Sequence, residues 1–64
     1  MLDNNTYNLM LQITQEQKSL WRMKKYYLYD SEKCAECNAF WTKFMTQKEE
    51  NIAEMKKLLQ KHVA

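Results

Sequence analysis

The chain has 64 residues, of which 45% are hydrophobic and 28% charged, and its net charge is +2. This composition allows one domain at most, argues against disorder, and leaves too small a charge excess for nucleic acid as a bulk partner. Gly and Pro are absent. The tight turns of a sheet protein are therefore excluded, and an all-α fold is predicted.

The sequence also predicts a compartment. It has no apolar run of the roughly 18 residues that a membrane span needs, and no charged-then-apolar signal peptide opens it. We therefore expect no membrane partner and residence in the cytoplasm. The two cysteines are separated by only two residues, so they cannot join distant elements as the disulfides of secreted proteins do.

The first predicted helix covers about residues 5–29. Cap-forming residues at positions 3–6 predict where it begins. Its predicted inner stripe consists of Met10, Ile13, Gln17, Leu20, Lys24 and Tyr27, widened by Thr14, Trp21 and Leu28. The spacing of three and four residues is typical of one helix face. One neighbouring helix cannot cover a stripe this broad.

A basic and aromatic patch lies in the last two turns of this predicted helix. It comprises Arg22, Lys24, Lys25, Tyr26, Tyr27 and Tyr29. Such side chains could stack the bases of single-stranded nucleic acid. A nucleic-acid domain normally has a stronger charge excess, so we interpret Tyr27 as part of the core and the lysines as solvated surface.

The chain is predicted to reverse at residues 30–32. Ser31, or Asp30 one position earlier, can accept hydrogen bonds from the first N–H groups of a new helix. Glu32 and Glu36 follow where the helix dipole favours negative charge. No Gly or Asn marks the end of the first helix, so a single unbroken helix of about sixty residues is the alternative.

The second predicted helix covers about residues 33–62. Its predicted inner stripe consists of Cys37, Trp41, Phe44, Met45, Lys48, Ile52, Met55, Leu58 and Leu59. His62 lies in the last turn, where a cation complements the helix dipole. We interpret His62 in that role and not as a metal ligand.

Residues 1–64 are thus expected to form one antiparallel two-helix hairpin. Leu20 lies level with Phe44 and Met10 level with Met55, with a polar layer between them. That layer consists of Thr14, Gln17, Lys48 and Asn51. Because two helices cannot bury such wide stripes, we expect the hairpin to dimerise into a four-helix bundle, or to form a tetramer. The polar layer is interpreted as setting the register of the bundle.

The polar layer resembles the metal site of ferritin-like and rubrerythrin-like proteins. In that family a Glu on one helix and Glu-x-x-His on its partner point into a four-helix bundle and hold two metal ions. Gln17, Lys48 and Asn51 stand here in place of the Glu, the Glu and the His. The resemblance, which covers roughly residues 14–62, implies a half-length relative that has kept the packing and lost the metal. A site shifted by one residue is the alternative and would use Glu16, Glu49 and Glu50.

Cys34 and Cys37 are the other candidate site. Both thiols lie near a predicted helix start, where the helix dipole lowers a thiol pKa. They supply two of the four ligands of zinc, so a metal site needs a second chain, as in the similar hooks of certain coiled-coil DNA-repair ATPases. A redox role lacks the βαβ context of thioredoxin-like proteins. The structural alternative makes Cys37 a small buried hydrophobe and Cys34 a bystander.

No catalytic constellation accompanies these residues. Paired catalytic carboxylates, a Ser-His-Asp order and a Gly-rich phosphate loop are all missing. We do not expect an enzyme, and the only cofactors to consider are zinc and iron. The predicted function is a self-associating structural or interaction module whose partner is a second copy, with a metal-binding or redox protein as the alternative.

Overall fold

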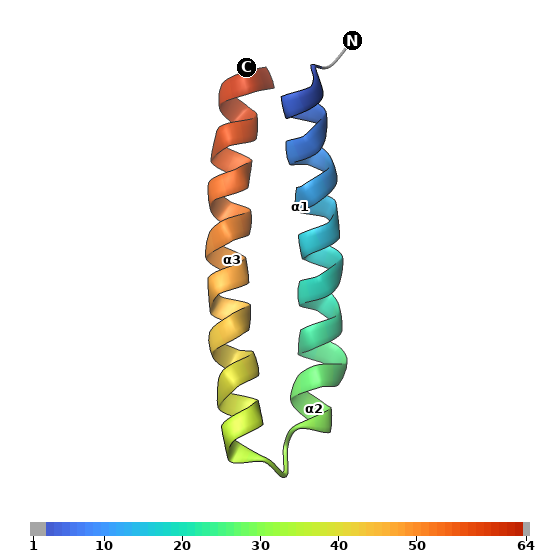
Figure 1. Ribbon diagram of the computed structural model, residues 1–64, viewed down its shortest axis with the longest axis vertical. Coiled ribbons are helices and arrows are strands. Elements are labelled where there is room, and N and C mark those ends of the chain that lie inside the picture. The colour runs from blue at the N-terminus through green and yellow to red at the C-terminus, as the bar shows by residue number, and fades with distance from the viewer. Residues whose placement is uncertain (1–2, 64) are drawn as a thin grey trace.

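In the computed structural model, residues 3–63 are described, with side chains as far as His62, and they form two helical arms (Figure 1). The first arm consists of α1 (Asn4–Arg22), the π-helical segment η1 (Met23–Tyr27) and α2 (Leu28–Asp30). The second arm is α3 (Ala35–Val63). The predicted all-helical hairpin is confirmed, and the single unbroken helix is wrong. Residues 1, 2 and 64 of the predicted domain lie outside the described residues.

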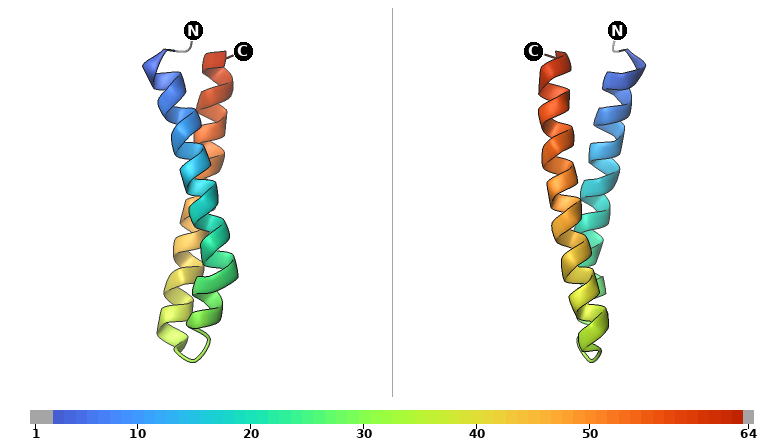
Figure 2. Two further views of the ribbon diagram at one scale, coloured as in Figure 1. Left: turned by 90° about the vertical axis from the view of Figure 1, so that its right-hand side faces the viewer. Right: turned by 60° about the vertical axis from the view of Figure 1, so that its left-hand side comes forward.

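The hairpin is long and thin, with extents of 48 × 15 × 13 Å. The turned views show that the arms cross at a shallow angle and that the start of α1 and the end of α3 lie opposite the turn (Figure 2). Within residues 3–63, no helix is long and apolar enough to cross a membrane.

α1 begins at a cap supplied by Asp3. Its carboxylate accepts a hydrogen bond from the N–H of Thr6 at 2.7 Å, and its carbonyl accepts one from the N–H of Tyr7 at 3.0 Å. The bond from the Thr6 backbone is the main reason that the pKa of Asp3 lies below its usual value. Because the first N–H groups of a helix lack partners within it, these bonds fix the start of α1.

A π-helical turn, η1, lies near the hairpin end of the first arm. The N–H of Leu28 donates to the carbonyl of Met23, five residues back, where an α-helix uses the carbonyl four residues back. This extra residue shifts the phase of the helix. Met23, Tyr27 and Ser31, which are four residues apart in the sequence, can therefore all face inward, and all three are buried or half-buried.

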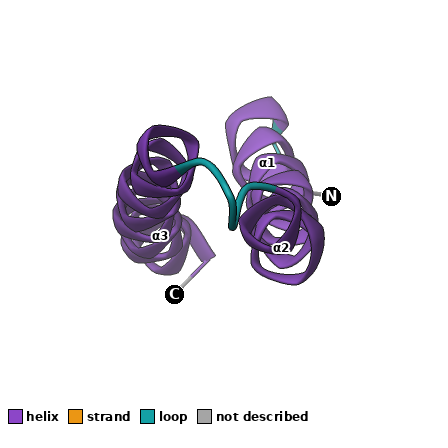
Figure 3. Cartoon of the chain, turned by 90° about the horizontal axis from the view of Figure 1, so that it is seen from below, coloured by secondary structure: helices purple, strands orange, loops and turns teal. Residues whose placement is uncertain are grey.

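The reversal at residues 31–34 uses no left-handed backbone, since none of residues 3–63 has a positive φ. The N–H of Ser31 donates to the Tyr27 carbonyl at 3.1 Å, and the N–H of Cys34 donates to the Ser31 carbonyl at 3.0 Å. The Leu28 carbonyl accepts from both sides of the turn, from the Ser31 hydroxyl at 3.3 Å and the Asn38 side-chain amide at 3.4 Å. Figure 3 shows this connection from below. A turn held by these bonds needs neither Gly nor Pro.

The prediction that Ser31 or Asp30 caps the second helix is wrong. Asp30 is the last residue of α2, and Ser31 follows it as the C-terminal cap. The Ser31 hydroxyl donates back to the Leu28 carbonyl of the first arm, and the N–H groups of Cys37 and Asn38 donate to Cys34 instead. α3 begins only at Ala35, and the sulfur of Cys34 takes the capping position.

The arms meet along one narrow seam, whose members are spaced alternately by three and four residues, as in an antiparallel coiled coil. All of its members are buried or half-buried: Thr6, Leu9, Ile13, Glu16, Leu20, Met23 and Tyr27 on the first arm, and Asn38, Trp41, Met45, Lys48, Ile52, Met55 and Leu59 on the second. Only four of the described apolar residues have less than a tenth of their surface exposed. They are Ile13, Met23, Met45 and Ile52. The hydrophobic core is therefore small.

The predicted stripes are wider than this seam. Met10, Phe44 and Leu58 were expected to face inward, but their exposed fractions are 44%, 41% and 43%. Lys24 and Cys37 are exposed as well. The reason is geometric, because a helix covers only a narrow stripe of a single neighbour. Residues at the edges of both predicted stripes remain in solvent.

We expect Ile13→Ala to lower the free energy of unfolding by about 2–4 kcal/mol, because it empties a buried position in the seam. Leu11→Ala is the matched control, since Leu11 is 45% exposed against 8% for Ile13, and it should cost about 1 kcal/mol or less. Urea denaturation followed by far-UV circular dichroism measures both. Equal losses would show that the seam is wrongly assigned.

Candidate functional site

The thiol pair lies where the turn meets α3. The Cys34 carbonyl accepts the N–H of Asn38 at 2.9 Å, and Cys34 Sγ accepts the N–H of Cys37 at 3.3 Å. The sulfur thus takes the position in which Ser or Asp usually supplies a capping oxygen. Both cysteines are exposed. The interpretation of Cys37 as a buried hydrophobe is therefore wrong.

The two thiols differ in acidity. The hydrogen bond from the Cys37 thiol, supported by the one from the Cys37 backbone N–H, holds the pKa of Cys34 below its usual value. The same thiol–thiol bond, together with the negative charge of Cys34, raises the pKa of Cys37. The pair is therefore asymmetric, with Cys34 as the more readily ionised member.

A groove of about 460 Å³ adjoins the thiols. Tyr27 and Trp41, whose ring centroids lie 4.9 Å apart, form its aromatic wall, and Asp30 and Ser31 border it from the turn. Tyr27 and Asp30 come from the first arm and Trp41 from α3. The hairpin is therefore what brings an apolar surface next to the thiols.

The structure does not assemble a metal centre from one chain. No group of three or more His, Cys, Asp or Glu side chains gathers in the part of the chain that is described. Within one chain the alternative carboxylates pair with lysines, since Glu16 pairs with Lys48 and Glu49 lies 3.9 Å from Lys24 Nζ. The thiol pair offers zinc two of the four ligands it needs.

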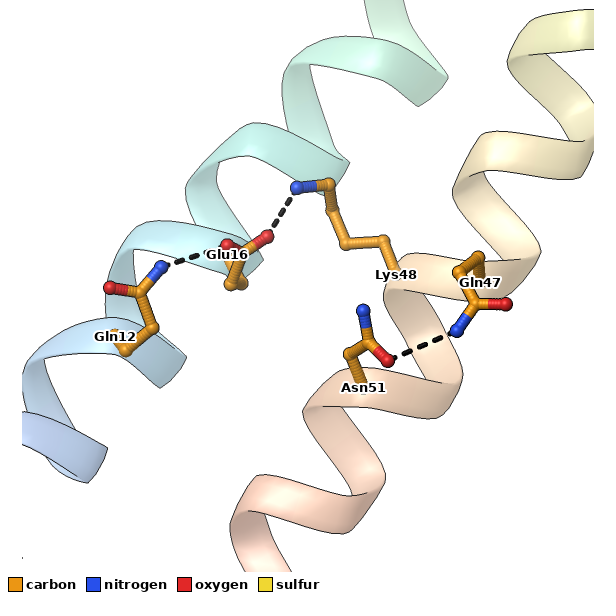
Figure 4. A network of polar contacts seen from close by, with 5 residues as sticks. All are labelled: Gln12, Glu16, Gln47, Lys48 and Asn51. Carbon is orange, nitrogen blue, oxygen red and sulfur yellow. Dashed lines mark hydrogen bonds and ion pairs between the residues drawn. The ribbon is translucent and has the colours of Figure 1, made fainter.

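The predicted polar layer is also placed differently. Thr14, Gln17 and Asn51 are exposed, and only Lys48 is half-buried. The side chain that Lys48 meets across the seam is Glu16, which lies one position before Gln17 (Figure 4).

A ladder of polar contacts surrounds this ion pair. The Gln12 amide donates to Glu16 at 2.8 Å along the first arm, and the Gln47 amide donates to Asn51 at 3.1 Å along α3. Of the contacts drawn in Figure 4, only that between Lys48 and Glu16 crosses from one arm to the other. Glu16 lies three residues after Ile13 and four before Leu20. This alternation of three and four residues was the sequence signal that could have identified Glu16 as a member of the seam.

Two residues of the basic and aromatic patch, Lys25 and Tyr26, contact the neighbouring Trp21 ring. Lys25 Nζ lies 4.7 Å from the centre of the Trp21 ring, and Trp21 meets Tyr26 edge-to-face with centroids 6.0 Å apart. Tyr29 is 70% exposed. Tyr27, interpreted as core, is half-buried against Trp41.

Comparison with protein families, with curated proteins and with solved structures finds no match for the chain. The resemblance to ferritin-like proteins stays a prediction.

The Glu16–Lys48 pair makes stability depend on pH. The bonds from Lys48 and then Gln12 hold the pKa of Glu16 below its usual value. The ionised pair therefore stabilises the fold above the unfolded-state pKa of about 4.3, and this contribution is lost as the pH falls below that value through the lowered pKa.

We expect Glu16→Gln to lower the free energy of unfolding by up to about 1 kcal/mol at neutral pH and by less at an acidic pH below the lowered pKa of Glu16, because the carboxylate of the parent protein is then itself protonated. Glu50→Gln, at an exposed position on α3, is the control. Urea denaturation at the two pH values checks this. Identical losses in the two variants at neutral pH would contradict it.

Proposed function

We propose that this chain is a self-associating helical hairpin, which dimerises into an antiparallel four-helix bundle and serves as a structural or interaction module. Its exposed area supports the proposal. The chain leaves 5274 Å² accessible, whereas a compact monomer of 7.8 kDa exposes about 4400 Å². The excess of about 900 Å² is close to the roughly 800 Å² that each partner buries in a standard interface.

Two apolar stripes are exposed, on opposite faces of the hairpin. The α3 stripe consists of Phe40, Phe44 and Leu58, and the α1 stripe consists of Tyr7, Met10 and Trp21. Leu58 borders a groove together with Gln12 on one face. Gln17, which lies on the same flank of α1 as Met10, borders a groove with Lys56 on the other. One partner helix therefore cannot bury both stripes, and each stripe needs a separate interface.

The α3 stripe is the better dimer face, because it is continuous with the seam. The Phe44 ring lies 6.0 Å from that of Trp41 and 5.8 Å from that of Phe40, and Trp41 packs on Tyr27 at 4.9 Å. These aromatic rings are already held in place by one another. Association consequently costs less side-chain entropy than it would for mobile residues.

The α1 stripe is partly covered by its own chain. Lys25 lies over the Trp21 ring and Tyr26 meets its edge, and an exposed cation–π contact contributes about 0.5–1 kcal/mol. A helix docking on Trp21 would have to displace Lys25. We assign this stripe to the second interface that a tetramer would use.

The α3 stripe is complementary to itself about Asn51. Phe44 and Leu58 lie seven residues before and after Asn51, on the same flank of the helix. When two α3 helices pair antiparallel about a two-fold axis at Asn51, Phe44 packs on Leu58 of the partner subunit. Such a contact closes on itself, so association through the α3 stripe alone stops at two copies.

Residence in the cytoplasm is part of the proposal. Cys34 and Cys37 carry exposed thiols, and a reducing compartment keeps closely spaced thiols in that state.

We expect the protein to sediment as a dimer at micromolar concentration and Leu58→Lys to raise its dimer dissociation constant at least tenfold, because the substitution places a charge in the apolar interface. Lysine near the end of α3 also agrees with the helix dipole, so a loss of helicity is not the expected cause. Sedimentation equilibrium measures both proteins.

Leu11→Lys is the matched control. Leu11 and Leu58 have nearly equal exposed fractions, 45% and 43%, but Leu11 belongs to neither stripe. It should leave the dissociation constant within about twofold of the parent value, since exposed substitutions away from such features change little. A folded parent protein that sediments at 7.8 kDa, or equal effects of the two substitutions, would refute the proposed interface.

A further inference from the structure

We infer that Cys34 and Cys37 form a thiol–disulfide exchange site, in which Cys34 attacks a disulfide substrate and Cys37 resolves the mixed disulfide. The two thiols belong to one chain, are exposed and border the same groove. The inference therefore does not depend on the proposed dimer.

The contacts of the two sulfurs assign their roles. Cys34 Sγ accepts the backbone N–H of Cys37 at 3.3 Å, so a negative charge on this sulfur is stabilised by a donor that is already in place. The pKa of Cys34 is lowered and that of Cys37 raised. Because the thiolate is the attacking species, Cys34 is the nucleophile and Cys37 keeps its proton until the second step.

The exchange proceeds in two displacements. The Cys34 thiolate attacks one sulfur of the substrate, so that a bond from Cys34 Sγ forms, the substrate S–S bond breaks, and the first thiolate leaves and takes a proton from water. Cys37 then gives its proton to solvent and attacks Cys34 Sγ, which releases the second thiol and forms the Cys34–Cys37 disulfide. The pair loses two electrons, and the substrate gains them as two thiols.

The short separation permits this internal disulfide. Side chains three residues apart in a helix have Cβ atoms about 5–6 Å apart, and a disulfide needs about 3.5–4.5 Å. Because Cys34 precedes the first residue of α3, the turn can supply this movement without breaking the helix interior.

The groove indicates the substrate class. Its volume of about 460 Å³ lies within the range of small-molecule sites. Tyr27 and Trp41 offer an apolar wall, and the exposed Asp30 can pair with an amino group. A small peptide disulfide that carries a free amine, such as glutathione disulfide, has this chemistry.

Zinc is the competing ligand, and the proposed dimer does not suit it. Cys37 lies fourteen residues from Asn51, which is about 21 Å along a helix. In an antiparallel pair centred on Asn51, the two thiol pairs are thus about 40 Å apart and cannot share one ion.

The test exposes the reduced full-length protein to glutathione disulfide near neutral pH, followed by acid quenching and mass spectrometry. The parent protein should form its internal disulfide and release two glutathione molecules per chain. Cys37→Ser should stop at a mixed disulfide on Cys34. Cys34→Ser should react at Cys37 several-fold more slowly, because the backbone N–H of Cys37 stabilises a thiolate at position 34 and the described residues provide no such donor to Cys37 Sγ.

Neither substitution is expected to unfold the hairpin, since Ser is favoured at a helix start. Circular dichroism checks that both variants stay helical. Equal rates for the two single-cysteine variants would overturn the assignment of roles. A parent protein that accumulates two glutathione adducts without an internal disulfide would overturn the exchange site. Stoichiometric zinc in freshly purified protein, with both thiols protected from alkylation, would assign the pair to metal instead.

Discussion

The structure depends on one contact, in which the two helical arms of the described chain pack on each other. A helix meets a single neighbour along a narrow stripe, so residues such as Ile13 and Ile52 are buried while Met10 and Phe44, one step around the helix, are not. The hairpin therefore has a well-defined register and a small core. Much of its apolar surface remains available for contacts with other molecules.

The Glu16–Lys48 pair lies within that contact and affects its specificity. The side chains of both residues are less than a quarter exposed. If one arm slid past the other by a turn, at least one of these charges would lose its partner while remaining half-covered, and the misaligned hairpin would lose the contribution of up to about 1 kcal/mol that the pair makes. Apolar residues alone would tolerate sliding better, since Ile, Leu and Met can replace one another along a seam. The ion pair thus selects one alignment of the arms.

The sequence predicted the helical class and the hairpin, because the lack of Gly and Pro, the cap-forming Asp3 and the polar break near Ser31 are local signals. It did not predict the phase of the first arm. Glu16 looks like a surface residue until Lys48, 32 positions later, is placed beside it. Local preferences also could not predict that Cys34, and not Ser31, caps the second helix, because Ser is the better capping residue. The Ser31 hydroxyl donates instead to the Leu28 carbonyl, a contact that only the folded turn provides. The thiols were identified as a candidate site, whereas the aromatic groove beside them required the folded hairpin.

The turn has a further consequence for variation in this chain. No residue of the reversal has a positive φ, so Glu32 and Lys33 could be exchanged for most other amino acids without strain. The sensitive position is Asn38, already inside α3, whose amide reaches back to the Leu28 carbonyl. Sequence divergence that leaves this fold intact should therefore be tolerated at the tip of the bend and restricted one helical turn beyond it.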